Sequence, residues 1–190
     1  MATRRRWSKS AILIMKYFDE LKRSMEMLAE HSDTLFLGQA VDCAGTAMSN
    51  TLKDVAGDKK LELPVCEDLQ MGITNGLALA GKIPVSIFPR WNFLLLGTNQ
   101  IVNHLDKFPI ISNFKTRAII RTGIGSVRPL HPHHQHTGDF TEAFNSMCNH
   151  IEVMRLDEPE DIFPAYTKAL TRQDGKSTIL VEWGDYYSEK

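Results

Sequence analysis

The sequence has few of the features that mark specialised classes of protein. Only three of its 190 residues are cysteines, and these are widely spaced and form no Cys-x-x-Cys pair: Cys43, Cys66 and Cys148. An odd, scattered set argues against a disulfide framework and is typical of reduced thiols, so we expect a cytoplasmic protein. No apolar run approaches the roughly 20 residues that a membrane-spanning helix needs.

An excess of charge of one sign is also absent. With 22 basic and 23 acidic residues the formal net charge is −1, which gives no reason to expect nucleic acid or a membrane surface as a partner. We interpret residues 1–10, which include a basic stretch, as a solvated tail, although a transit peptide or an anion-binding arm would look similar. No repeat or low-complexity linker divides the remainder, so residues 11–190 are predicted to form one domain.

Apolar runs alternate with amphipathic stretches along the chain. Strands are predicted at residues 34–37, 84–88, 117–121, 151–154 and 177–183, and helices at 14–28, 46–55, 94–105, 140–149 and from 157 onward. This alternation predicts an α/β fold in which a mostly parallel sheet has helices on both faces. Many unrelated functions share that architecture, so the function must be sought in a site.

Residues 63–81 are the most informative segment. A short extended piece is followed by an acidic pair, Glu67 and Asp68, which opens a helix rich in small residues. Three small residues stand four apart on one face of this helix: Gly72, Gly76 and Ala80. They predict close packing against a second helix, inside the domain or across a subunit boundary. Alone, the segment is also consistent with an ordinary helix start that has acidic first-turn residues.

Three ordered blocks carry a family resemblance. The first comprises Pro64, Cys66, Glu67, Gly76 and residues 78–81 and 84–85; the second is 92–103, and the third is 136–144. Their order and ungapped spacing resemble the pyrimidine-binding domain of the transketolase family, in particular the N-terminal half of the beta subunit of the pyruvate dehydrogenase first component. The resemblance extends from about residue 35 to residue 183.

This resemblance implies thiamin diphosphate as the cofactor, which itself serves as the electron sink. In the family a glutamate shares a proton with the N1′ nitrogen of the aminopyrimidine and so favours its imino tautomer, whose nitrogen acts as the base. By resemblance Glu67 is this residue, and a carboxyl group suits the role because it exchanges a proton readily. Asp68 is out of register and is expected to cap the helix or to face solvent.

The resemblance also assigns roles to side chains outside this helix. Phe93 matches the aromatic residue that packs on the aminopyrimidine ring, although an ordinary core phenylalanine remains the alternative. His136 aligns with the histidine that contacts the substrate oxygen or relays a proton. His134 and Arg128 are expected to assist with an anionic group of the substrate. Gln39, which stands where the beta subunits usually have an acid, is expected to contact the cofactor.

Four histidines within residues 131–136 leave other hypotheses open. Imidazole is a common metal ligand, so the loop is also consistent with a metal-binding protein. No nearby cysteine or closely spaced pair of acids completes a ligand set, and we therefore assign no metal ligands in this chain. A plain solvated loop is the third alternative.

The family's diphosphate anchor is missing from the sequence. In the family a second domain holds the diphosphate through a divalent ion and uses a Gly-Asp-Gly segment, which this sequence lacks. The resemblance therefore implies a separate subunit that holds the diphosphate and magnesium, in a heterotetramer that acts on a 2-oxo acid or a sugar phosphate. Related dehydrogenase beta subunits continue into a C-terminal domain that this sequence does not include. We therefore expect a decarboxylase or transketolase rather than a dehydrogenase. A non-catalytic assembly subunit with the same fold is the competing hypothesis.

Overall fold

The structure is a computed structural model that describes residues 16–43, 46–112, 114–125, 127 and 131–187. The tail at 1–10 and the expected substrate residue Arg128 lie outside the described residues. Six strands form one sheet in the order β2-β1-β3-β4-β6-β5, and each neighbouring pair is parallel. They are β1 (Thr34–Gly38), β2 (Lys60–Glu62), β3 (Ile83–Phe88), β4 (Ile119–Ile124), β5 (Ile151–Leu156) and β6 (Ser177–Trp183).

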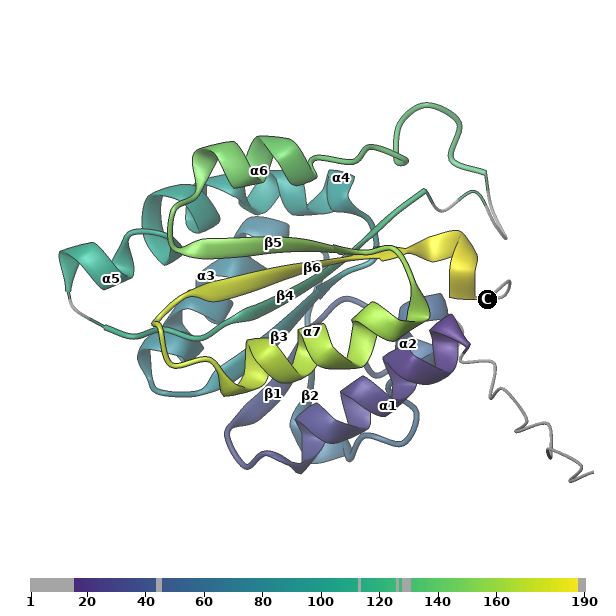
Figure 1. The fold of residues 1–190 in the computed structure, drawn as a ribbon, viewed down its shortest axis with the longest axis horizontal. Helices are drawn as coiled ribbons and strands as arrows, with labels where there is room; N and C mark the ends of the chain where they lie inside the picture. Colours follow the sequence, from purple (N-terminus) through teal and green to yellow (C-terminus); the bar gives the residue numbers. More distant parts are fainter. Residues whose placement is uncertain (1–15, 44–45, 113, 126, 128–130, 188–190) are drawn as a thin grey trace, which may run out of the picture.

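Helices cover both faces of the sheet (Figure 1). One face carries α1 (Tyr17–Glu30), α2 (Ala47–Asn50) and α7 (Pro159–Thr171), and the other carries α3 (Glu67–Leu79), α4 (Trp91–Leu94) and α6 (Thr141–Met147). The shorter elements are η1 (Gly57–Lys59), η2 (Leu95–Gly97), η3 (Gln100–Leu105), α5 (Phe108–Ile111) and η4 (Gly184–Tyr187). The predicted α/β fold with a parallel sheet is confirmed.

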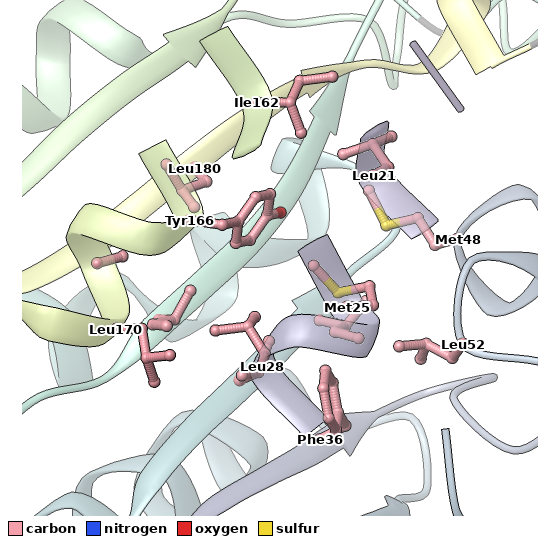
Figure 2. Close-up of a cluster of buried hydrophobic side chains, with 14 of the residues drawn as sticks. Leu21, Met25, Leu28, Phe36, Met48, Leu52, Ile162, Tyr166, Leu170 and Leu180 are labelled. Carbon is pink, nitrogen blue, oxygen red and sulfur yellow. The ribbon is translucent and has the colours of Figure 1, made fainter. Parts of the chain in front are cut away.

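Each face of the sheet has its own apolar core. Four side chains of α1, spaced three or four residues apart, have no exposed surface: Tyr17, Leu21, Met25 and Leu28. Figure 2 shows three of them in one cluster with Ile162, Tyr166 and Leu170 of α7. The opposite core includes Met71, Trp91 and Phe144. Because helices cover both sides, all six residues of β3 are buried, as expected for a central parallel strand.

The predicted helix at 94–105 is broken, and this prediction was wrong. The chain passes through η2 and then through η3, which is a π-helix. Gly97 lies against α3, where an added Cβ would come within 2.7 Å of the Met71 side chain. Asn75 donates a hydrogen bond to the Gln100 carbonyl at 3.0 Å, and this side chain competes with the helical ladder.

Two further differences concern short elements near the edge of the sheet. The helix predicted at 46–55 is reduced to α2 and turns, and the sequence analysis missed β2. That strand has only three residues, of which the last two are exposed, so it lacks the apolar pattern by which strands are recognised.

The carboxyl ends of the strands meet at one edge, where ligand sites of parallel sheets lie. Gln39 directly follows β1, α4 begins three residues after β3, and the histidine loop follows β4. Gly38 is required at the end of β1, since its φ is 150° and an added Cβ would lie 2.4 Å from the carbonyl oxygen of Ile87. This close approach of β1 to β3 sets where Gln39 leaves the sheet.

Candidate active site

Glu67 is the first residue of α3, and its position follows from the preceding strand. The backbone N–H of Leu63 donates to the Gly38 carbonyl at 2.9 Å, which guides the extended segment to the start of the helix. Glu67 is only 7% exposed, whereas Asp68 is exposed. Among the described residues the Glu67 carboxylate accepts one hydrogen bond, from Gln39 Nε2 to Oε1 at 3.3 Å. A buried carboxylate with one long hydrogen bond has acceptor capacity left for a ligand.

The loop that carries Gln39 is fixed by an acid that the sequence analysis missed. The Glu62 carboxylate accepts three successive backbone N–H groups, from Ala40 at 2.6 Å, Val41 at 2.8 Å and Asp42 at 2.9 Å. Successive N–H groups of this kind form an anion-binding nest. Ala40 has a φ of 53°, a strained conformation for a residue with a side chain, which the three hydrogen bonds offset. No sequence pattern indicated this role.

Phe93 and His136 lie together in the structure. Their ring centroids are 5.0 Å apart at an interplanar angle of 47°. Phe93 is half-buried, whereas its helix neighbours Trp91 and Leu94 have no exposed surface. Phe93 also belongs to neither apolar core, and this disfavours the alternative of an ordinary core phenylalanine.

The start of α4 holds the histidine loop in place. Arg90 donates from Nη1 to the His136 carbonyl at 3.0 Å, and the Gly138 N–H donates to Asn92 Oδ1 at 3.2 Å. Burial lowers the pKa of Arg90, against an opposing effect of Asp185. His136 Nδ1 is buried and has no hydrogen-bond partner among the described residues. No sequence pattern indicated that Arg90 and Asn92 position this loop.

The Gln39–Glu67 pair and the Phe93–His136 pair lie at the same end of the molecule. An added Cβ on Gly97, four residues after Phe93, would lie 3.4 Å from the Glu67 carbonyl oxygen. The segment that follows Phe93 therefore rests on the first turn of α3. His134 is exposed and makes no hydrogen bond or ring contact with these residues among the described contacts.

The histidine loop gives no geometric support to a metal site. Within the described part of the chain, no three His, Cys, Asp or Glu side chains are close enough to hold a metal ion. His131 Nδ1 accepts the backbone N–H of His133 at 2.9 Å, and the two rings lie 5.4 Å apart.

Of the helices described, none has the length and apolar character needed to cross a membrane.

Comparison with known proteins decides the family. A model of the family described as "Transketolase, pyrimidine binding domain" matches residues 16–184. The chain belongs to this family. The resemblance inferred from the three sequence blocks is thereby confirmed.

The chain spans only part of the length of the relatives that it matches. The chain is 31% identical over 123 residues to the beta subunit of the pyruvate dehydrogenase E1 component of Gracilaria tenuistipitata var. liui, and the match spans 62% of this chain and 38% of that protein. A split-gene transketolase, described as an inactive beta tetramer, superposes with a TM-score of 0.66 at 14% identity, over 87% of this chain and 50% of the other.

Two further solved structures share the fold. Transketolase from Campylobacter jejuni superposes with a TM-score of 0.68 at 13% identity, over 88% of this chain and 25% of the other. Benzoylformate decarboxylase from Polynucleobacter necessarius superposes with a TM-score of 0.61 at 17% identity, over 93% of this chain and 31% of the other.

Membership of the family implies thiamin diphosphate as the cofactor. The buried Glu67 carboxylate, the half-buried Phe93 ring and the partnerless His136 Nδ1 fit its pyrimidine half.

Proposed function

We propose that the chain is the pyrimidine-binding half of a split thiamin diphosphate enzyme that acts on a 2-oxo acid or a sugar phosphate. The observation that carries the proposal is the buried Glu67 carboxylate, which has a single hydrogen bond among the described residues, at the carboxyl edge of the sheet. When bound, thiamin diphosphate supplies the electron sink for cleaving or forming a carbon–carbon bond.

The side chains of this chain divide the remaining tasks. Glu67 holds, on a carboxylate oxygen, the proton that it shares with N1′ of the aminopyrimidine, and Gln39 orients that carboxylate through its amide N–H. Phe93 offers its ring face to the flat heterocycle. His136 donates or accepts a proton at the substrate oxygen, while its backbone carbonyl is held by Arg90.

A separate subunit with a Gly-Asp-Gly segment holds the diphosphate and magnesium in this proposal, because the sequence has no such segment. The surface beside Glu67 is suited to a partner, since three apolar side chains are exposed there: Val65 at 77%, Leu69 at 49% and Leu96 at 65%. An added Cβ at Gly72 or Gly76 would meet nothing within 4 Å, so this face of α3 is open to a neighbouring chain.

The assembly proposed is a cytoplasmic heterotetramer of two pyrimidine and two diphosphate subunits. The split-gene transketolase whose beta chains alone form an inactive tetramer supports the need for a partner. The scattered, unpaired cysteines support a reducing compartment.

The test is Glu67→Gln, assayed with the partner subunit present. We expect turnover to fall by about 100-fold or more, because positioned acid–base groups contribute on that order. Asp68→Asn is the matched control, since this neighbouring acid is exposed, and it should keep full activity. Undiminished turnover in Glu67→Gln, with an intact complex, would favour the hypothesis of a non-catalytic assembly subunit.

A further inference from the structure

Four cationic side chains gather at the edge of the sheet opposite the proposed active site. Lys115 and Arg117 precede β4, while Arg172 and Lys176 lie in the turn that leads from α7 into β6. Because the strands are parallel, these segments lie at their amino ends, and the proposed active site lies at their carboxyl ends (Figure 1). A pocket of about 90 Å³ is lined by Lys115, Thr116, Arg117, Arg172, Gln173, Gly175 and Lys176.

Packing holds the two sides of this pocket together. Gly175 has a φ of 76°, and an added Cβ there would lie 3.3 Å from Cγ of Lys115, so the stem of Lys115 lies against the turn. The backbone N–H of Thr178 donates to the Ala118 carbonyl at 2.9 Å, which joins the starts of β4 and β6. The cationic groups are therefore brought together by the fold and not by one local segment.

The lining residues do not neutralise this charge. None of them is acidic. Arg172 pairs with Asp174 at 2.8 Å and with Glu152 at 3.2 Å. In the part of the chain that the structure describes, the other three cations have no ion pair: Lys115, Arg117 and Lys176. Asp174 and Glu152 offset part of the positive charge, and a bound anion would offset the rest.

One residue of the pocket wall is buried and its hydroxyl oxygen is covered by protein rather than exposed to the pocket. Thr116 lines the pocket and is 1% exposed, and its Oγ1 has no hydrogen-bond partner among the described residues. Buried polar atoms are normally paired. The cationic lining of the pocket is the chemistry that binds a tetrahedral oxyanion such as phosphate.

We infer that this pocket binds the phosphate group of a small ligand, with Lys115, Arg117 and Lys176 as its charged partners. Guanidinium and ammonium groups are the usual phosphate ligands of proteins. A simpler role, in which the cations only complement the carboxyl end of α7, accounts for Arg117, which donates to the Leu170 carbonyl at 2.8 Å. It does not account for the two lysines, whose ammonium groups make no hydrogen bond to that helix among the described contacts.

The test is titration of the full chain with inorganic phosphate at constant ionic strength, followed by calorimetry and by the thermal unfolding midpoint. We expect saturable binding and a midpoint that rises with occupancy. The double variant Lys115→Ala, Lys176→Ala should raise the dissociation constant at least tenfold. Lys53→Ala is the matched control, because Lys53 is exposed and remote from the pocket in sequence, and it should bind phosphate as the parent chain does.

Parallel titrations with glycerol 3-phosphate and with glycerol identify the source of the phosphate group. Tighter binding of the monoester than of the free ion supports a phosphorylated metabolite, and equal or weaker binding supports inorganic phosphate. The inference is overturned if phosphate gives no saturation, if chloride at equal ionic strength has the same effect, or if Lys53→Ala weakens binding as much as the double variant. None of these outcomes depends on the proposed enzymatic function.

Discussion

At the residue scale, the proposed site depends on one contact between two side chains that lie 28 positions apart in the sequence. Gln39 Nε2 donates to Glu67 Oε1 at 3.3 Å, and the Gln39 amide remains a neutral donor at any pH. The sequence predicted both residues as part of the cofactor site, Glu67 because it matches the family's glutamate and Gln39 because it stands where the beta subunits usually have an acid. It did not predict that they contact each other, since that depends on where β1 and the start of α3 meet.

We predict that Gln39→Ala lowers kcat/KM by about fivefold. The lost hydrogen bond to a carboxylate is long, so its removal should cost about 1 kcal/mol of transition-state stabilisation. Steady-state kinetics of the assembled enzyme measure this change. Lys53→Ala, at an exposed position outside both proposed sites, provides the control. An unchanged kcat/KM for Gln39→Ala would show that Gln39 does not orient the carboxylate.

At the element scale, patterns repeated over many residues predicted the structure better than single contacts did. The helix α1 and the strands β1, β3 and β6 followed from apolar spacing, and β6 matches its predicted range of 177–183. The interrupted segment after α4 could not be predicted this way. Its breaks depend on the contacts of Gly97 with Met71 and of Asn75 with Gln100, which are invisible to local periodicity. The nest around Glu62 is equally non-local.

Asp106, at the end of η3, ties this segment to the turn before β5. Its carboxylate has no exposed surface and accepts the backbone N–H groups of Asn149 at 2.8 Å and His150 at 2.6 Å. Burial by itself raises the pKa of Asp106, but the hydrogen bonds from Lys107 and from these two N–H groups outweigh it, and the pKa lies below its usual range. The ionised form is therefore favoured in the folded state.

We predict that Asp106→Asn lowers the free energy of unfolding at pH 7 by about 1–3 kcal/mol, the usual cost of weakening hydrogen bonds to a buried charged group. Because the pKa of Asp106 is lower in the folded state than the unfolded value near 3.9, its ionisation stabilises the fold at any pH above that unfolded value. This stabilisation is lost as the pH falls through the folded pKa. The difference in unfolding free energy between the parent and Asp106→Asn should therefore become smaller below about pH 4. Urea unfolding at pH 7 and pH 3 tests this, with exposed Asp58→Asn as control. A difference independent of pH would contradict it.

At the scale of the whole molecule, one buried ion pair connects elements from distant parts of the chain. Arg121 of β4 and Glu182 of β6 have no exposed surface and are joined by two hydrogen bonds, at 2.5 Å and 3.0 Å. Tyr166 of α7 donates to the same carboxylate at 2.5 Å, and Arg121 also donates to Thr51 at 2.8 Å. Tyr187 of η4 is a further donor to the Glu182 carboxylate. This network could not be predicted from the sequence, because its members are separated by up to 136 positions and none forms a motif.

We predict that Glu182→Gln lowers the free energy of unfolding by about 3–5 kcal/mol, because it leaves the Arg121 guanidinium buried without a counter-charge. For a chain of this length the thermal midpoint should fall by about 10 °C. The control is Glu26→Gln, which removes one partner of a partly exposed ion pair with Lys22 and should cost less than about 1 kcal/mol. Similar shifts in the two variants would show that the buried network is not an organising element of the fold.

The central claim is a cofactor site divided between two chains, and calorimetry of thiamin diphosphate with magnesium tests it most directly. The titration is made on this chain, on a partner subunit that carries a Gly-Asp-Gly segment, and on their mixture. We predict saturable binding in the mixture and none to this chain alone, because this sequence lacks the diphosphate anchor. No binding to a stable complex of the two, or equally tight binding to this chain alone, would contradict the account.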